Sequence, residues 1–94
     1  MRIEGFIWYR DIVDKILWKH NVTHVEVEEA FKNRPKFKMI EKGNIGKENL
    51  YVAYGQTHAG RYLTVLFIYK QTREALIITA RDMDSKERKN YAKK

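Results

Sequence analysis

Two arginines and one histidine are the residues of this sequence best suited to chemistry on a phosphate. Arg61 opens a long apolar segment, Arg81 ends another, and His20 follows Lys19 at the end of an expected helix. Guanidinium groups held at strand ends can clamp a phosphate through fixed bidentate donors. Histidine has an unperturbed pKa of about 6.5, so it can carry a proton in either direction near neutrality. These groups suit metal-free RNA cleavage, in which a base takes the 2′-hydroxyl proton, cations stabilise the phosphorane and an acid protonates the leaving 5′-oxygen.

The two-residue period of a strand predicts on which sheet face each arginine lies. Arg61 is in phase with the apolar residues of the segment that follows it, and Arg81 is in phase with Ile77 and Thr79. The hypothesis requires that both guanidinium groups and the His20 imidazole meet at one pocket.

Other chemistries lack the residues they need. The chain has no cysteine, and its single serine, Ser85, lies outside any nucleophile motif. His20 and His24 have the spacing of two ligands on one helix, but Asn21 and Thr23 stand between them as a helix end and a helix start. Glycine-rich phosphate loops are also missing. The sequence therefore predicts neither a metal site nor a cofactor.

Charge points to a polyanionic partner. Nineteen Lys and Arg residues stand against twelve Asp and Glu residues, which gives a net charge of +7 and a pI near 9.7. Such a balance in a small domain favours nucleic acid, although a merely cationic surface is an alternative. The basic segment from Lys32 to Lys47 contains a single acidic residue, Glu41, and is expected to contact the RNA backbone. Its cations are Lys32, Arg34, Lys36, Lys38, Lys42 and Lys47.

Periodicity and turn residues predict the elements that must position these groups. Asn21 is expected to cap the first helix, and the capping box of Thr23 and Glu26 opens the second. Asp84 and Glu87 repeat that box before the last helix. Helices are expected over 11–20, from 24 to before Pro35, and from 85 to about 92; strands are expected over 3–8, 37–40, 50–57, 61–69 and 75–81.

This order predicts a single α+β domain over residues 1–94. Consecutive strands with short turns favour an antiparallel sheet of four to five strands, with two N-terminal helices on one face and a C-terminal helix. The last strand is apolar on both faces and is expected inside the sheet. The tyrosines at strand positions are interpreted as packing residues rather than base-stacking platforms. They are Tyr51, Tyr54, Tyr62 and Tyr69.

Location is predicted from two further features. The longest apolar stretch, from Tyr62 to Tyr69, has the length of a strand and is far short of the roughly 20 residues of a membrane helix. The N-terminus lacks the apolar run of a signal peptide. Together with the absence of cysteine, these features favour a reducing cytoplasm and no membrane contact.

Several motifs in order resemble the BrnT-type toxins. The segment Lys19-His20-Asn21-Val22 is similar to the Lys-His-Gly-Val turn of that family, and the end of the chain is similar to its Ile-Ser-Ala-Arg ending followed by Glu-Arg and Tyr. The matching positions are Trp8, Lys19 to Val22, Phe31, Gly55, Gly60-Arg61, Ile77 to Arg81, Glu87-Arg88 and Tyr91.

The resemblance implies a RelE-like fold and a ribonuclease toxin of a type II toxin–antitoxin pair. Such toxins cleave RNA without a metal, inhibit translation and are held inactive by a DNA-binding antitoxin. The polar positions of the family fall on Lys19, His20, Arg61, Arg81, Glu87 and Arg88.

The chain departs from the family pattern at three places. Tyr9 follows Trp8 where an aspartate is usual, Asn49 follows Glu48 where an arginine is usual, and the basic segment replaces an acidic loop. The alternative function is therefore a catalytically inactive module that binds nucleic acid or a protein partner through the same basic face.

Overall fold

Eight elements make up the fold, in a computed structural model that describes residues 1–43 and 48–93. Residues 44–47, at the end of the basic segment, lie outside the described residues. The elements in chain order are β1 Gly5–Ile7, α1 Arg10–His20, α2 His24–Lys32, β2 Lys36–Glu41, β3 Leu50–Gln56, β4 Tyr62–Tyr69, β5 Glu74–Asp82 and α3 Ser85–Ala92. The predicted β-α-α-β-β-β-β-α order is confirmed.

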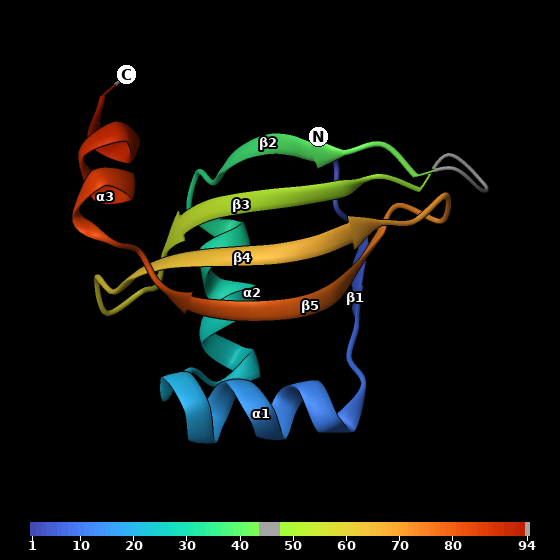
Figure 1. Cartoon of the computed structure of the whole chain (residues 1–94), viewed down its shortest axis with the longest axis horizontal. Coiled ribbons are helices and arrows are strands. Elements are labelled where there is room, and N and C mark those ends of the chain that lie inside the picture. The colour runs from blue at the N-terminus through green and yellow to red at the C-terminus, as the bar shows by residue number, and fades with distance from the viewer. Residues whose placement is uncertain (44–47, 94) are drawn as a thin grey trace.

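The five strands form one sheet in the order β1-β5-β4-β3-β2 (Figure 1). Antiparallel pairing joins β2 to β3, β3 to β4 and β4 to β5. The remaining pair, β1 with β5, is parallel. The predicted antiparallel sheet is confirmed for β2 to β5, and β1 adds a parallel strand at its edge, because no hairpin turn connects β1 to β5 and fixes their relative direction. The predicted interior position of β5 is confirmed.

Local chemistry sets the ends of the helices as predicted. Asn21 caps α1 in the left-handed conformation with φ 54°. Its N–H donates to the Leu17 carbonyl oxygen, and the N–H of Val22 donates to that of Ile16. The Thr23 side chain and the Glu26 carboxylate complete a capping box at the start of α2. Asp84 and Glu87 do the same for α3. These caps satisfy backbone donors that the first helical turn leaves free.

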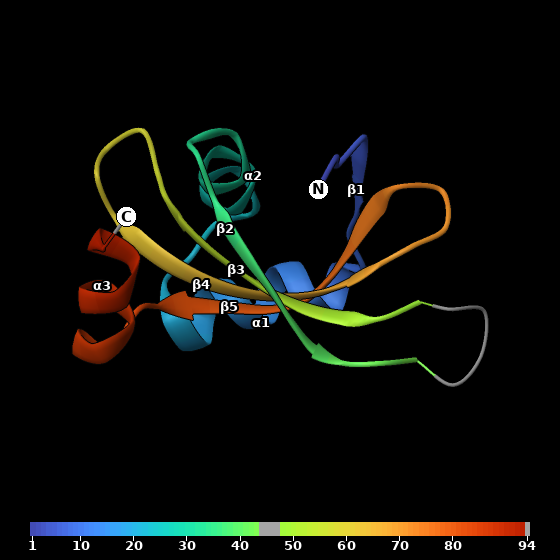
Figure 2. The same cartoon turned by 90° about the horizontal axis from the view of Figure 1, so that it is seen from above.

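The core lies between the sheet and the first two helices. Ile16 of α1 and Val27 of α2 are fully buried in one cluster with Leu63, Val65 and Phe67 of β4. We call this side of the sheet the helix face. α3 lies at the end of the sheet where β5 ends, on the opposite side from α2 (Figure 2). That opposite side, which α1 and α2 leave uncovered, is called the open face.

No helix in the described part of the chain is long and apolar enough to cross a membrane.

Candidate functional site

Arg61 holds the α1–α2 turn against the end of the sheet. Its Nε and Nη2 atoms donate to the Asp82 carboxylate at 2.6 and 3.1 Å. The same guanidinium donates to the carbonyl oxygens of Asn21 and His20 at 2.5 and 3.0 Å. It also forms an ion pair with Glu26 at 3.3 Å. The hydrogen bond with Asp82 raises the pKa of Arg61, so this arginine is a permanently charged structural clamp.

Arg81 forms a second cluster with Glu87. Its Nη1 and Nη2 atoms donate to the two Glu87 carboxylate oxygens at 2.8 and 2.9 Å. Glu87 Oε1 also accepts from the Thr64 hydroxyl at 3.0 Å and from the Asp84 N–H at 2.9 Å. Oε2 accepts only from Arg81 among the described residues, so one side of the carboxylate has acceptor capacity left. The hydrogen bond from Arg81 lowers the pKa of Glu87, which is therefore ionised at neutral pH.

The two arginines lie on opposite faces of the sheet. Leu63 is paired with Asp82 and Thr64 with Arg81, so Arg81 shares the face of Thr64, whereas Arg61 lies on the helix face with Leu63. The pairing shifts between Leu66 and Phe67, which leaves Ile78 as an extra residue in β5. Such a β-bulge reverses the alternation beyond it. The prediction that Arg81 is in phase with Ile77 is wrong for this reason.

His20 and Lys19 lie at the end of α1, beside Arg61 rather than Arg81. The charge of His20 contributes to the lowered pKa of Asp82, after the larger effect of the Arg61 hydrogen bond. Lys19 is exposed in the last turn of the helix. The expectation that His20, Arg61 and Arg81 share one pocket is therefore wrong: the first two meet on the helix face, and Arg81 lies on the other side.

A groove on the open face surrounds the Arg81–Glu87 pair. It consists of two adjoining depressions of about 180 and 280 Å³ that both border Tyr54 and Glu87. Arg81 and Thr64 line the smaller one, and the side chains of Lys36 and Lys38 from β2 line the larger one together with α3. We call these two depressions the open-face groove.

Tyr54, which was predicted as a packing residue, lines the groove. Burial raises its pKa, and the nearby Glu87 charge raises it further, so its hydroxyl stays protonated at neutral pH. Tyr54 is paired with Thr64, which is paired with Arg81, and these three side chains therefore lie in one row on the open face. Only the register of three strands reveals this row, and the sequence carries no local signal for it.

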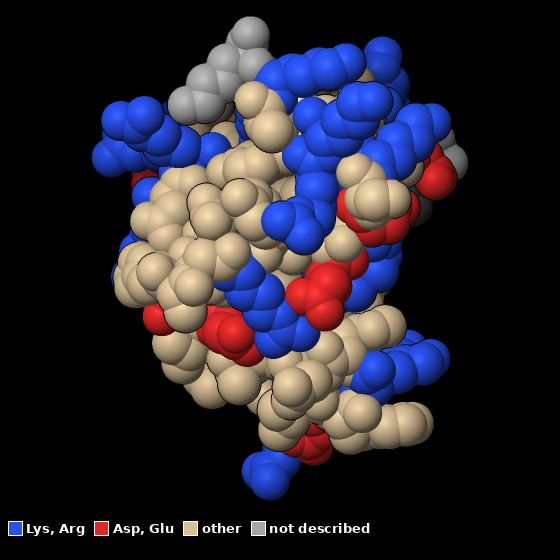
Figure 3. Space-filling view, turned by 90° about the vertical axis from the view of Figure 1, so that its left-hand side faces the viewer, with Lys and Arg blue, Asp and Glu red and all other residues tan. Residues whose placement is uncertain are grey.

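The five predicted RNA-binding cations lie on α3 or on the elements next to it. Lys32 ends α2, Arg34 lies in the α2–β2 turn and Lys36 and Lys38 lie on β2. Arg88 lies on α3, where its guanidinium is 4.4 Å from the centre of the Tyr62 ring. The face that includes α3 carries many Lys and Arg side chains with a few acidic ones among them (Figure 3). The structure thus gathers these five residues at one end of the sheet.

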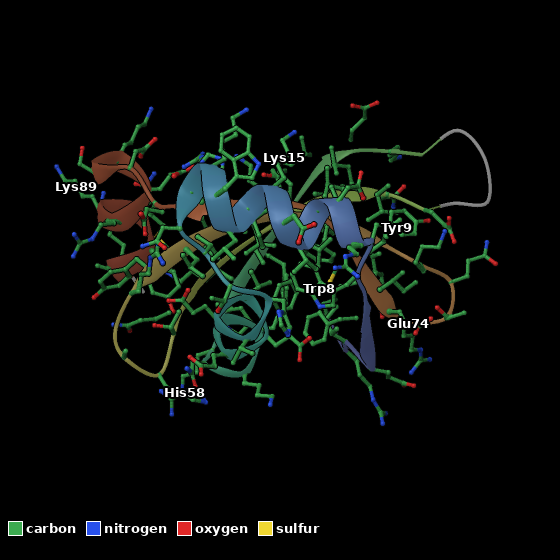
Figure 4. The ribbon with its side chains drawn as sticks, turned by 90° about the horizontal axis from the view of Figure 1, so that it is seen from below. Trp8, Tyr9, Lys15, His58, Glu74 and Lys89 are labelled. Atoms are coloured by element: carbon green, nitrogen blue, oxygen red, sulfur yellow. The ribbon has the colours of Figure 1, made fainter. Side chains whose placement is uncertain are left out.

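The histidines occupy separate places. His24 packs edge-on against Trp8, whose indole N–H donates to Glu28 at 2.9 Å; seen from below, Trp8 lies between α1 and α2, whereas His58 lies in the loop beyond α2 (Figure 4). His58 contacts the Asn33 side chain. Within residues 1–43 and 48–93, no three His, Asp or Glu side chains form a group that could hold a metal ion.

The chain is thus a small basic α+β protein. One face of its sheet is left uncovered by α1 and α2, and lysine side chains border the groove on that face. A family of ribonuclease toxins, BrnT, of type II toxin–antitoxin systems matches residues 8–87, and the chain belongs to this family. Membership implies ribonuclease activity, an RNA substrate and an antitoxin partner. No curated protein sequence matches the chain.

Proposed function

We propose that the chain cleaves single-stranded RNA without a metal ion, in the open-face groove and around the Arg81–Glu87 pair. The observation that carries this proposal is that an arginine with a fixed guanidinium and an ionised carboxylate lie together on the sheet face that α1 and α2 leave uncovered. Lys36 and Lys38 border the same groove and supply positive charge for the RNA backbone.

The reaction needs a base, a group that stabilises charge and an acid. Glu87 accepts the 2′-hydroxyl proton through Oε2 as the 2′-oxygen forms its bond to phosphorus. The remaining N–H groups of Arg81 bind the non-bridging oxygens, whose negative charge grows in the phosphorane. Tyr54 donates its proton to the 5′-oxygen as the P–O5′ bond breaks. The products are a 2′,3′-cyclic phosphate and a 5′-hydroxyl, and water returns the proton from Glu87 to Tyr54.

Lys19, His20 and Arg61 have other roles in this proposal. The Arg61 donors already bind Asp82, Glu26 and two backbone carbonyls, so this guanidinium is not free for a phosphate. His20 lies beside the Arg61 cluster, and Lys19 is the residue before His20 in the last turn of α1. These residues stabilise the end of the fold that presents Arg81.

The antitoxin is proposed to inhibit by covering the same groove. A partner with acidic side chains would neutralise Lys36 and Lys38 while it blocks access to Arg81. We expect a small DNA-binding protein in this role, in the cytoplasm where both partners are made.

A second candidate function is a non-cleaving RNA-binding module. The observation in its favour is that Glu87 already occupies both terminal nitrogens of Arg81. A module of this kind would bind RNA with a steep dependence on salt and release no product.

Incubation of the purified protein with RNA in EDTA tests the proposal. We expect cleavage with 2′,3′-cyclic phosphate ends, and we expect Glu87→Gln to remove most of it while RNA binding is retained. Binding without cleavage by the wild-type protein would establish the second candidate instead, and cleavage that EDTA abolishes would contradict the metal-free route.

A further inference from the structure

A further pocket of the described chain adjoins the open-face groove. It has a volume of about 740 Å³ and lies between the α2–β2 turn, the adjoining ends of β3 and β4, and α3. This size is typical of sites that bind small molecules or parts of larger ones. Tyr62 and Tyr91 form its aromatic wall, and Lys32, Arg34 and Lys36 bring positive charge to it. We call it the tyrosine pocket.

The two tyrosine rings are held in place by their neighbours. Their centroids are 6.0 Å apart with the planes at 75°. Arg88 lies over the Tyr62 ring, and the Lys36 ammonium lies 5.4 Å from the centre of the Tyr91 ring. Because the rings are already fixed, a flat ligand that stacks on one of them orders little further.

Charge on the pocket wall selects an anionic ligand. Lys32 and Arg34 are exposed beside the rings, and none of the described residues that line the pocket is acidic. Burial, and then the neighbouring Tyr62, raise the pKa of Tyr91, so this ring brings no negative charge at neutral pH. Arg34 has φ 50°, which is uncommon for a residue other than glycine. The wall therefore combines neutral aromatic rings with cations and an unusual backbone.

The tyrosine pocket continues into the open-face groove. Lys36 and Tyr91 line both this pocket and the larger depression of the groove, and that depression contains Glu87. Lys36 Nζ donates to the Tyr91 carbonyl oxygen at 2.8 Å, and also to the carbonyl oxygen of Lys93, so it anchors α3 at the border between the two sites. A strand of RNA lying in the groove can extend directly into the pocket.

We propose that the tyrosine pocket binds one base of single-stranded RNA, on a nucleotide close to the bond cleaved at Arg81. The base stacks on Tyr62 or Tyr91, and Lys32 and Arg34 contact its flanking phosphates. Aromatic stacking and cations are the usual means by which proteins hold unpaired RNA bases. The pocket then determines which nucleotide is preferred beside the cleaved bond. This inference deepens the proposed ribonuclease function and rests on it.

Binding of an uncleavable RNA tests the pocket separately from cleavage. The probe is a short single-stranded RNA with 2′-O-methyl groups throughout, and its dissociation constant is measured for the full chain. We expect Tyr62→Leu to weaken binding about 5- to 100-fold, as for the loss of one stacked base, and Tyr62→Phe to bind like wild type. Ring protons of Tyr62 and Tyr91 should shift in the NMR spectrum when the RNA is added.

Charge reversal provides a variant that does not disturb packing. Lys32→Glu changes an exposed side chain of the pocket and should weaken binding, whereas Lys15→Glu changes an exposed side chain of α1 that does not line the pocket and should leave binding unchanged. Unchanged RNA affinity in Tyr62→Leu and Lys32→Glu would overturn the pocket proposal. So would a loss confined to antitoxin binding, since the pocket would then be a protein site. Cleavage that persists in these variants and is lost in Glu87→Gln would leave the proposed function standing.

Discussion

Arg61 and Arg81 contact the same residue from opposite faces of the sheet. Arg61 binds the carboxylate of Asp82, and Arg81 donates to its backbone carbonyl at 3.0 Å. The result is a structural cluster on the helix face and a charged pair on the open face, joined through one residue of β5. Two arginines that suggest a single phosphate clamp in the sequence therefore have different roles in the fold.

Removal of the Arg61 side chain should destabilise the protein. Arg61→Ala leaves Asp82, Glu26 and two turn carbonyls without their donor, and we expect the free energy of unfolding to fall by about 2–3 kcal/mol. Arg2→Ala is the matched control, because Arg2 forms one ion pair with Glu4 and is 77% exposed; it should cost less than about 1 kcal/mol. Urea denaturation measures both. Equal losses in the two variants would show that Arg61 is not a clamp.

Replacement of Gly55 should separate α2 from the sheet. A Cβ atom on Gly55 would lie 2.4 Å from the Ala30 carbonyl oxygen, whereas one on Gly5 would have no described neighbour closer than 3.6 Å apart from its chain neighbours. We expect Gly55→Ala to lower the free energy of unfolding by about 1–3 kcal/mol and Gly5→Ala to change it little. Thermal unfolding followed by circular dichroism tests this; a wild-type midpoint for Gly55→Ala would contradict the close packing.

Stability should fall at acid pH in part because of Glu87. Arg81 holds the pKa of Glu87 below its ordinary value of 4.5, so the unfolded chain binds this proton more readily than the folded chain. The stabilisation is thus complete above about pH 4.5 and is lost as the pH falls through the lower folded pKa. In Glu87→Gln the free energy of unfolding should depend less on pH between 3 and 5. Parallel pH profiles for the two proteins, from urea denaturation at each pH, would exclude this contribution.

Lys38 should contribute to RNA binding through charge alone. It is exposed on β2 and borders the open-face groove. Lys38→Ala should reduce the slope of log affinity against log salt by about 0.7, as for one released counterion on single-stranded RNA. Lys15→Ala on α1 removes an equal charge away from the groove and should leave the slope as in wild type. The same reduction in both variants would point to net charge rather than to the groove.

Local sequence signals predicted the elements because the residues that end helices act on their own neighbours. The Asn21 cap and the two capping boxes depend on side chains within three residues of the backbone groups they satisfy. The alternation of β4 likewise placed Arg61 on the helix face correctly. These features need no knowledge of the rest of the fold.

The composition of the site could not be predicted in the same way, because it depends on the register between paired strands, for which the sequence has no local signal. The bulge at Ile78 follows from how β5 fits β4, and it alone moves Arg81 to the open face. Tyr54 joins Arg81 only because β3, β4 and β5 align in one register. The parallel pairing of β1 is also a property of the assembled sheet. Glu87 was predicted as a site residue from the family resemblance alone. Its two hydrogen bonds with Arg81 give the physical reason for its position beside that arginine.

Cleavage rates of two single variants test most directly whether the open face is the site of reaction. RNA is incubated in EDTA with wild type, Arg81→Lys and His20→Ala, all at a temperature where each is folded. Arg81→Lys keeps the charge but loses the bidentate fork, and we predict a rate at least about 100-fold below wild type. The cleavage rate of His20→Ala should stay within about threefold of wild type. His20 lies beside Arg61 on the helix face, and Arg61 contacts its backbone carbonyl, which alanine retains. A large loss in His20→Ala with near-normal cleavage by Arg81→Lys would place the reaction on the other face and contradict the proposed site.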